Sequence, residues 1–472
     1  MIRILHAYFP VRTLFLGITE ALLVSVAFLA ATVARLGTGG AGYVLNQQHG
    51  SIKIICISLA FVICMYYFDL YDSAVLGNRR EVLIRLTQVL GTVYCLLLLL
   101  HYIYPPLELG RGISVIGLAL VMLCLFFWRR LFSKINSIPD LADRVVILGD
   151  GPLADILQRE YESRPELGLR LVGRIPAIGG ADSQAGSQRP ERRGDAPAKE
   201  AVEDLSRAVK FFRASSIVVA MSDRRGKLPV DALLAMKCRG LQVHDGADLY
   251  EAITGKVQTE YVRLGWLLFS PGCHASKIHL AYKRAASILV SISGLILTLP
   301  LLPLIYLAIR LTSPGPALYR QRRVGRDGIE FHCYKFRTMR QDAEADTGPT
   351  WAADDDPRIT RVGALLRKLR LDEIPQLWNV LRGDMCLVGP RPERPEFVSA
   401  LRQEIPYYDL RHTVRPGITG WAQVRHKYGS SVEDAREKLR YDLFYIKNMS
   451  IGLDFLVFFQ TIKVILWARG AK

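Results

Sequence analysis

The sequence is poor in paired cysteines and in acidic residues. Its eight cysteines stand singly, and none belongs to a C-x-x-C pair or to a Cys/His cluster with the spacing of a zinc site. This pattern excludes a structural zinc domain and a disulfide framework, and it indicates isolated reduced thiols in lipid or cytoplasm. The 472 residues include 44 Asp and Glu against 61 Lys and Arg, which gives a formal net charge of +17. We therefore expect an anionic partner: nucleic acid, a lipid headgroup or a phosphorylated substrate.

Apolar residues, in contrast, make up half of the sequence and gather in continuous runs near the N-terminus. Four of these runs are each close to the ~20 residues that a helix needs to cross a bilayer: residues 11–34, 52–68, 86–104 and 113–132. The first run is too long for the apolar part of a signal peptide, and no clear cleavage site follows it, so we expect a retained membrane helix. The pattern predicts a membrane protein with a bundle of four transmembrane helices in residues 1–140, and it disfavours a nucleic-acid-binding protein.

The cations that flank these runs predict the orientation of the bundle. Under an alternating topology, eight Arg and Lys residues fall on one side of the membrane and three on the other. Because loops rich in Lys and Arg stay in the cytoplasm, both ends of the four-helix unit are predicted to be cytoplasmic. The rest of the chain would then begin in the cytoplasm.

A turn containing glycines follows the membrane segment. Residues 144–160 read RVVILGDGPLADILQRE, in which a β-branched strand leads into Gly149-x-Gly151-x-x-Ala154 and a helical pattern. This is the turn of dinucleotide-binding folds, where glycines let a phosphate approach a helix N-terminus closely. Further strand-like runs occur at residues 169–175, 215–221 and 241–245. Together these segments predict a Rossmann-like α/β domain at residues 141–265.

Two features leave the role of this α/β domain open. Pro152 stands where the turn needs backbone N–H groups, and no acidic residue ends the second strand to hold a ribose. A working nucleotide site is therefore an alternative to a scaffold or oligomerisation module, which we favour, and the chain is a possible homo-oligomer. Residues 176–201 are rich in Gly, Ala, Ser, Pro and charge, which predicts a flexible surface insertion.

A fifth apolar run, residues 285–309, has 25 residues and as a straight helix would measure about 37 Å, enough to cross a bilayer. Pro300 and Pro303 lie past its midpoint, however, and each removes a helix N–H and clashes with the preceding turn. Cations flank both ends of the run, which places both ends in the cytoplasm. We therefore predict a re-entrant membrane helix at residues 284–310, bent at these prolines, with Thr298 or Ser293 as a partner for carbonyls freed near the bend. The alternative is a kinked spanning helix that would place the following segment outside the cell.

An adjacent acid pair, Asp372-Glu373, occurs among cations in the C-terminal part. It lies within residues 366–397, LRKLRLDEIPQLWNVLRGDMCLVGPRPERPEF. Pro375 suits the first turn of a following helix, which would place both carboxylates at a helix N-terminus, where phosphate also binds. Two carboxylates repel a phosphate unless a divalent metal and arginines neutralise the charge, and the other acid can then attack phosphorus as a nucleophile. A capping acid pair with surface salt bridges explains the local pattern equally well.

Two segments before the acid pair add positive charge. Residues 330–339 alternate like a strand and carry Lys335 and Arg337, and residues 358–371 place an apolar stripe beside a cationic helix face. Such a helix suits either an anionic membrane surface or an ordinary core-facing position, and the sequence favours neither.

Four stretches of this region occur, in the same order, in a known family of bacterial enzymes. They read SPGPALYRQRRVGRDGIEFHCYKFRTM, LRLDEIPQLWNVLRGDMCLVGPRP, VRPGITGWAQV and YDLFYIKNMSIGLDFLVFFQTIKVI. Over residues 279–469 the chain resembles the catalytic domain of the polyprenyl-phosphate hexose-1-phosphate transferases, the monotopic phosphoglycosyl transferases. The preceding membrane helices and α/β domain resemble the longer members, which initiate exopolysaccharide, O-antigen or capsule biosynthesis. The resemblance implies an α/β catalytic domain at residues 275–472, with the re-entrant helix as a further mark of the family.

The resemblance also implies a reaction and its location. In this family a sugar-1-phosphate passes from a UDP-sugar to undecaprenyl phosphate, with Mg²⁺ as cofactor and with release of UMP. The catalytic domain would lie on the cytoplasmic face of the bacterial inner membrane. The partners would be the UDP-sugar, undecaprenyl phosphate and the lipid bilayer, with no nucleic acid. Glucose or galactose is the sugar that the exopolysaccharide-type subgroup suggests.

The roles of the family's residues carry over position by position. Asp372 would be the nucleophile that bears the phosphosugar, and Glu373 together with Asp372 would hold Mg²⁺. Arg367, five residues before the nucleophile, and Arg391 of the Gly-Pro-Arg-Pro motif would bind phosphate.

Three further cations are implied with less detail. Lys335 and Arg337 match the family's KFRTM-type strand and would add charge at the same place. Many members continue Trp-Ala-Gln-Val with Asn-Gly-Arg-Asn, but this chain reads RHKYGSSVEDA at residues 425–435. Lys427 would stand in for the arginine of those members, and the departure limits what can be inferred about sugar contacts.

Two other functions remain as alternatives. A membrane-bound nucleotide-sugar dehydratase or epimerase would use the Gly149 turn, but such enzymes resemble short-chain dehydrogenases, and none of the 20 tyrosines begins their Tyr-x-x-x-Lys pair. A non-catalytic scaffold of a polysaccharide assembly complex would act through its α/β domain.

Overall fold

The computed structural model describes the whole chain except residues 1, 5–6, 73–74, 76–77, 108, 137–141, 165–167, 177–204, 222–223, 225–227, 260–275, 344–347, 349, 351–355, 427–428, 430 and 468–472. The chain divides into two compact units, Phe9–Gly246 and Ala247–Lys472, with the residues before Phe9 shared between them. The predicted insertion at 176–201, apart from its first residue, and Lys427 lie outside the described residues.

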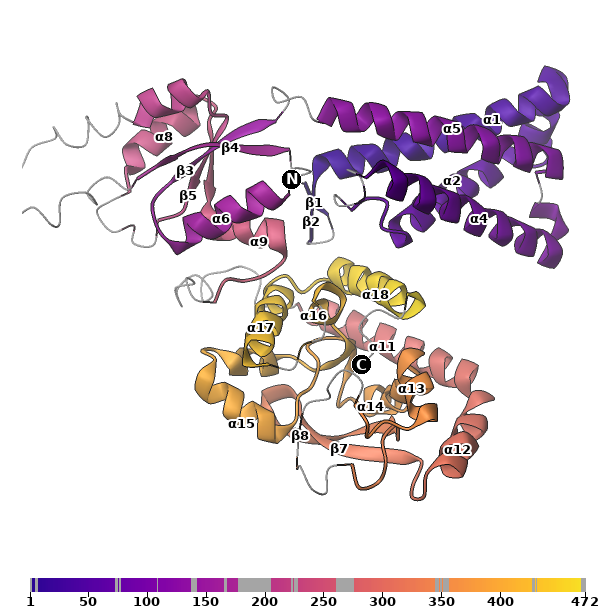
Figure 1. The fold of residues 1–472 in the computed structure, drawn as a ribbon, viewed down its shortest axis with the longest axis vertical. Coiled ribbons are helices and arrows are strands. Elements are labelled where there is room, and N and C mark those ends of the chain that lie inside the picture. Colours follow the sequence, from indigo (N-terminus) through magenta and orange to yellow (C-terminus); the bar gives the residue numbers. More distant parts are fainter. Residues whose placement is uncertain are drawn as a thin grey trace, which may run out of the picture. The chain divides into compact units, whose positions relative to one another are not determined.

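Long apolar helices dominate the first unit (Figure 1). After a small sheet of β1 (Ile2–Ile4) and β2 (Ala7–Phe9), the helices are α1 (Val11–Gln47), α2 (Gly50–Tyr67), α4 (Arg79–Ile103) and α5 (Arg111–Asn136), with a 3₁₀ turn at Pro105–Leu107. Together with α11 (Lys277–Thr298) of the second unit, five helices in the described part are long and apolar enough to cross a membrane. The five helices indicate a membrane protein.

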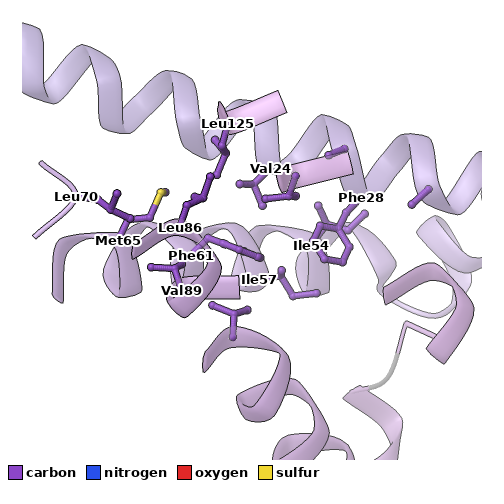
Figure 2. Packing of buried hydrophobic residues seen from close by; sticks show 14 of the residues in the cluster. Val24, Phe28, Ile54, Ile57, Phe61, Met65, Leu70, Leu86, Val89 and Leu125 are labelled. Carbon is purple, nitrogen blue, oxygen red and sulfur yellow. The ribbon is translucent and has the colours of Figure 1, made fainter. Parts of the chain in front are cut away.

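The four helices of the first unit share one buried apolar core. Figure 2 shows side chains from all four helices meeting in this cluster, among them Val24, Phe28, Ile54, Ile57, Phe61, Met65, Leu86, Val89 and Leu125. The outward-facing side chains are apolar as well, and Phe15, Leu22, Ile55 and Phe127 are each more than half exposed. Helices that are apolar on all sides are expected where the surrounding solvent is lipid.

An ion pair within this core joins three parts of the helical unit. The Arg129 guanidinium of α5 lies 2.7 Å from the Glu20 carboxylate of α1, and both side chains are almost completely buried. The same arginine donates a hydrogen bond of 2.6 Å to the carbonyl of Leu70, in the connection between α2 and α4. Because a buried charge is costly unless paired and hydrogen-bonded, this contact ties α1 and α5 to that connection.

One helix is longer than its apolar run predicts. Helix α1 continues to Gln47, although the predicted run ends at residue 34, and Gly37 within it adopts a left-handed φ of 69°. The extension passes through a glycine-rich stretch, which is unfavourable for a helix by propensity. The apolar run therefore predicts the membrane-length part of α1 but not the residue at which the helix ends.

A parallel four-stranded sheet completes the first unit. Its strands are β3 (Asp143–Leu148), β4 (Leu169–Ile175), β5 (Ser216–Val219) and β6 (Gln242–Asp245) in the order β4-β3-β5-β6, with α6 (Pro152–Ser163) and α8 (Val230–Cys238). The sheet confirms an α/β domain.

An arginine side chain, that of Arg174, occupies the glycine turn at the carboxyl end of this sheet. Gly149 has a φ of 121°, in the region that favours glycine. Arg174, near the end of β4, donates to the Gly149 carbonyl at 3.1 Å and pairs with Asp150 at 2.9 Å and Asp155 at 2.6 Å. Dinucleotide-binding folds place an acid for the ribose near this strand end, where this chain has Arg174. A scaffold or oligomerisation module stays the favoured prediction, and a nucleotide site stays the alternative.

The second unit contains short helices, two small sheets and the fifth apolar run. Its elements are α9 (Gly246–Thr254), α11, α12 (Leu301–Thr312), β7 (Leu318–Val324), β8 (Glu330–Phe336), α13 (Arg361–Lys368), α14 (Gln376–Arg382), β9 (Cys386–Val388), α15 (Pro395–Glu404), β10 (Gly417–Thr419), α16 (Trp421–Arg425), α17 (Val432–Lys447) and α18 (Ile451–Leu466). Strands β7 and β8 form an antiparallel hairpin, and β9 and β10 pair in parallel.

The fifth apolar run is two helices rather than one. Helix α11 ends at Thr298 and α12 begins at Leu301, so the break falls at Leu299 and Pro300. Pro300 and Pro303 have no N–H to donate to the carbonyls of Ile296 and Leu299, four residues back. The residue before each proline donates instead: Leu299 N–H to the Ile296 carbonyl and Leu302 N–H to the Leu299 carbonyl, both at 3.3 Å. Thr298, one of the expected partners at the bend, donates to the Gly294 carbonyl one turn back, at 2.7 Å.

Candidate active site

Lys335 lies on strand β8 of the β7–β8 hairpin, within the second unit. Tyr319 of β7 faces Lys335 of β8 across the antiparallel pair, and Cys333 on the same face of β8 is buried. Alternate residues of a strand point to one face. Lys335 therefore lies on the side of the hairpin that packs against the rest of the unit.

The acid pair lies in a single 3₁₀ turn, Leu371–Glu373, between two helices. Thr360 caps α13 by accepting from the Gly363 N–H at 2.9 Å, and the helix ends three residues before the turn. The residue before the turn, Arg370, has a φ of 58°, a conformation that non-glycine residues adopt mainly where the surroundings impose it. The acids precede α14, and Pro375, which was expected in the first turn of that helix, is the residue immediately before it.

The Arg391 loop follows β9 and is held by a close crossing of glycines. The N–H of Gly389 donates to the Thr419 carbonyl at 2.8 Å, and the N–H of Gly417 donates to the Pro390 carbonyl at 2.9 Å. A Cβ atom on Gly417 would lie 2.1 Å from the Gly389 nitrogen, closer than atoms can approach. The GPRP and RPGITG motifs are therefore two sides of one backbone contact that fixes the loop.

Three cations converge on one oxygen of Glu373. Arg391 Nη2 lies 2.6 Å from Glu373 Oε1, Arg370 Nη1 lies 3.7 Å from it, and Lys335 Nζ lies 3.9 Å from it. The Glu373 side chain is 11% exposed, so these charges interact with little screening by water. The site is a compact set of one carboxylate and three cations beside Asp372.

These surroundings shift the pKa values of Asp372 and Glu373 in opposite directions. Burial acts to raise the pKa of Glu373, but Arg391, Lys335 and Arg370 together hold it below its ordinary value. Burial raises the pKa of Asp372, and the charge of Glu373 raises it further, against the three cations. Burial and the nearby Arg391 lower the pKa of Lys335, against the attraction of Glu373. Neighbouring acids with opposed shifts are characteristic of sites where the two acids have different roles.

Asp372 differs from Glu373 in that one of its carboxylate oxygens has no hydrogen-bond partner among the described residues. The residue is 8% exposed, and in the described part of the chain its Oδ1 atom is buried without a hydrogen-bond partner. A buried oxygen of this kind is costly and needs a functional explanation. A metal ion or a reacting phosphorus atom would satisfy it.

The described residues fit a divalent metal only in part. Among them, no group of three or more His, Cys, Asp or Glu side chains is gathered to hold an ion. Mg²⁺, however, is commonly held by one or two carboxylates together with substrate phosphates. The unpartnered Oδ1 of Asp372 and the adjacent Glu373 supply two such carboxylates.

The other predicted cations lie elsewhere or are engaged differently. Arg367 Nε donates to Thr338 Oγ1 at 2.9 Å. The Arg337 guanidinium donates to the carbonyls of Ser313 and Pro314, at 2.7 and 2.8 Å, and so ties the end of α12 to the hairpin. Among the contacts of the described residues, no ion pair joins Arg337 or Arg367 to the acid pair, so their roles as phosphate ligands stay predictions.

Two residues at the site carried no assignment from the sequence. Arg370 was one cation among many, and its positive φ, which turns the chain into the acid pair, has no signal in the sequence. Asn379 of α14 is completely buried, donates to the His332 carbonyl at 2.7 Å and accepts from the Tyr334 N–H at 3.0 Å. This amide fastens the helix after the acids to the strand that carries Lys335. A polar residue amid the apolar WNVL run was the available signal.

An apolar surface adjoins the site. Figure 1 shows α13 and α14 beside the α11–α12 pair, and these helices are in contact. Large apolar side chains on them are roughly half exposed or more: Ile296, Leu297, Leu299, Leu304, Leu365, Leu369 and Trp378. Helix α13 faces the core through the buried Leu366, while Leu365 and the following Leu369 are about half exposed. Whether this outer side lies at a membrane surface stays a prediction.

Comparison with known proteins adds a family match. Residues 278–468 match the family described as bacterial sugar transferase. The chain is 45% identical over 235 residues to a UDP-N-acetylgalactosamine-undecaprenyl-phosphate N-acetylgalactosaminephosphotransferase of Aeromonas hydrophila. The matched residues make up 49% of this chain and 54% of that protein. It is 34% identical over 323 residues to the UDP-glucose:undecaprenyl-phosphate glucose-1-phosphate transferase of Escherichia coli K12, covering 67% and 66%.

A third relative is matched over most of its length. The chain is 32% identical over 408 residues to the undecaprenyl-phosphate glucose phosphotransferase of Komagataeibacter xylinus, covering 79% of this chain and 72% of that protein. For the first two relatives the chain spans between about half and two thirds of their length, 54% and 66%.

Proposed function

The chain belongs to the bacterial sugar transferase family, and from this premise we propose that it transfers a sugar-1-phosphate from a UDP-sugar to undecaprenyl phosphate and releases UMP. This would be the first step in assembling a surface polysaccharide. The observation that carries the proposal is the buried, unpartnered carboxylate oxygen of Asp372 beside a carboxylate whose charge three cations balance. The three relatives are named as transferases acting on undecaprenyl phosphate.

The transfer proceeds in two steps that use the same carboxylate. Asp372 attacks the phosphorus next to the sugar, a new bond forms between its oxygen and that phosphorus, and the bond to the bridging oxygen breaks. UMP leaves with the bridging oxygen and its electron pair. An oxygen of the lipid phosphate then attacks the same phosphorus, which forms the lipid diphosphate sugar and frees the Asp372 carboxylate.

The neighbouring residues bind and orient the diphosphate. Arg391, Lys335 and Arg370 offset the charge of Glu373, so a phosphate can approach two carboxylates without net repulsion. Arg391 is placed to donate to phosphate oxygens, and a planar guanidinium suits such oxygens. Glu373 and Asp372 would hold Mg²⁺, which supplies positive charge to the diphosphate when bound. The buried setting of Asp372 keeps water away from the phosphorus during transfer.

We propose that the α11–α12 pair is re-entrant and holds the site at a membrane surface. Ile305 and Ile309 of α12 belong to one buried cluster with Phe336 of β8, Leu366 of α13 and Ile374. A helix that continued through the bilayer would carry its second half away from these partners. Cations flank both ends of the pair, and this supports a hairpin that enters and leaves on the cytoplasmic face of the bacterial inner membrane. The four N-terminal helices would form a transmembrane bundle.

The re-entrant arrangement predicts that both ends of the pair react from the same side. In a background without native cysteines, Lys277→Cys at the start of the pair and Arg322→Cys after it are both exposed positions. A membrane-impermeant maleimide should label neither in intact spheroplasts and both in inverted vesicles. Gln48→Cys, between α1 and α2, is the matched control and should label from outside. Labelling of Arg322→Cys from outside would show a spanning helix.

The proposed activity is tested by UMP release. The full-length chain in detergent is incubated with undecaprenyl phosphate, Mg²⁺ and a panel of UDP-sugars, among them UDP-glucose, UDP-galactose and UDP-N-acetylgalactosamine. We expect UMP, not UDP, to appear with one or two members of the panel, together with a lipid diphosphate sugar. Absence of UMP with every sugar, or release of UDP in its place, would contradict the proposal.

A further inference from the structure

A second arginine holds the backbone of Arg391. Arg411 lies in a 3₁₀ segment, Tyr408–Thr413, and its Nη2 atom donates to the carbonyl oxygen of Arg391 at 2.9 Å. Its side chain is 6% exposed. A buried guanidinium is expensive to desolvate, so its small set of partners indicates what it does.

Two further residues, Asp442 and Tyr408, contact the Arg411 guanidinium. Arg411 Nη2 lies 2.9 Å from Asp442 Oδ2 of α17, and Nη1 donates to the hydroxyl of Tyr408 at 2.5 Å. The Asp442 side chain is 2% exposed. Burial raises the pKa of Asp442 to about 6, against the attraction of Arg411, and the carboxylate pairs with the guanidinium. Asp442 and Tyr408 thus fix the guanidinium of Arg411, and its third contact is the hydrogen bond to the Arg391 carbonyl.

The chain of contacts leads from α17 to the acid pair. Asp442 orients Arg411, Arg411 holds the Arg391 carbonyl, and the Arg391 side chain reaches Glu373 Oε1 at 2.6 Å. A hydrogen bond from a charged donor is stronger than one from a neutral donor. The peptide group of Arg391 is therefore held from one side by Arg411 while the glycine crossing holds the loop from the other.

We propose that Arg411 is a positioning residue that, through the Arg391 backbone, sets where the Arg391 guanidinium meets the diphosphate. This inference rests on the proposed sugar-phosphate transfer and assigns a residue for it that lies outside the acid pair and its cations. Arg411 touches neither acid, and its effect reaches the substrate through Arg391. A displacement of the order of 1 Å at a charged donor can lower catalysis about a hundredfold.

A purely structural role makes a different prediction. If the Arg411–Asp442 pair only fastened the 3₁₀ segment to α17, its loss would lower the melting temperature and leave the activity of each folded molecule unchanged. A positioning role lowers kcat/KM in folded protein, and it does so only while Arg391 is present to be positioned. A double-mutant cycle separates the two.

The test measures kcat/KM for UMP release with the best UDP-sugar, at a temperature well below each variant's melting temperature. The variants are Arg411→Lys, Arg391→Lys and the double substitution. Lysine keeps the charge but cannot pair with Asp442 and also donate to Tyr408 and the Arg391 carbonyl from one rigid plane. Arg402→Lys is the matched control, because Arg402 pairs with Asp409 at 2.7 Å and both side chains are more than half exposed.

We expect Arg411→Lys to lower kcat/KM by about 10- to 100-fold, Arg402→Lys to change it less than about twofold, and Arg411→Lys to cost less than about threefold in the Arg391→Lys background. Wild-type kcat/KM in Arg411→Lys, or equal losses in both backgrounds, would overturn the inference alone. Should Arg411→Lys fail to fold, Tyr408→Phe removes a single partner and should give a smaller loss with the same dependence on Arg391. A wild-type chain that releases no UMP would overturn the proposed function as well.

Discussion

Asp372→Asn is expected to abolish turnover while leaving the fold intact. The amide has nearly the size of the carboxylate, and Asp372 Oδ1 has no hydrogen-bond partner among the described residues, so little native structure depends on the charge. An amide cannot act as the nucleophile that forms an acyl-phosphate. We expect UMP release to fall by on the order of 10³-fold or more. Thermal unfolding in the same detergent should show a melting temperature no lower than that of the wild type.

The control for this variant is Asp327→Asn. Asp327 lies in an exposed turn with its side chain 63% exposed, and its φ of 56° is a conformation that asparagine adopts readily. Asp327→Asn should retain wild-type UMP release. If Asp372→Asn also released UMP at the wild-type rate, Asp372 could not be the nucleophile.

Glu373→Gln is expected to have the second largest effect. The substitution removes the negative charge that Arg391, Arg370 and Lys335 surround, and it removes one of the two carboxylates that would hold Mg²⁺. Three cations without their counter-charge also bind the diphosphate and UMP too strongly for efficient release. We expect kcat to fall by on the order of 10²- to 10³-fold and the Mg²⁺ concentration for half-maximal rate to rise. The measurement is UMP release over a range of Mg²⁺ concentrations.

Glu330→Gln provides the comparison for this second effect. Glu330 lies on the same strand as Lys335, pairs with Arg322 at 3.3 Å, and its side chain is 44% exposed. Its loss should leave both the rate and the Mg²⁺ dependence unchanged, because exposed pairs contribute little. A Glu373→Gln protein with reduced rate but an unchanged Mg²⁺ requirement would exclude Glu373 as a metal ligand and leave its role as the counter-charge of the cations.

Contiguous signals in the sequence predicted the long elements well. Apolar runs of membrane length correspond to α1, α2, α4 and α5, because a helix in lipid needs little more than length and apolarity. The prolines at 300 and 303 marked the break between α11 and α12 for the same local reason. The end of α1 was missed, because it depends on packing beyond the apolar run.

The site was less accessible from the sequence, because it depends on contacts between distant segments. Lys335 and Arg391 are 38 and 18 residues from Glu373, and the fold brings both beside it. Arg337 was expected with them, but it lies just past the end of β8 and turns to carbonyls at the end of α12. Arg411 had no local signal at all, because its partners Asp442 and Arg391 are separated from it by 31 and 20 residues.

The covalent step through Asp372 is tested most directly by trapping it. The full-length chain is mixed with a UDP-sugar carrying an isotopic label in the sugar, without lipid acceptor, then quenched and digested for peptide mass spectrometry. We predict the mass of a labelled sugar-phosphate on the peptide that contains Asp372, its loss on addition of undecaprenyl phosphate, and its absence in Asp372→Asn. UMP release in one burst with the label on another residue, or with no label on the protein, would contradict the account.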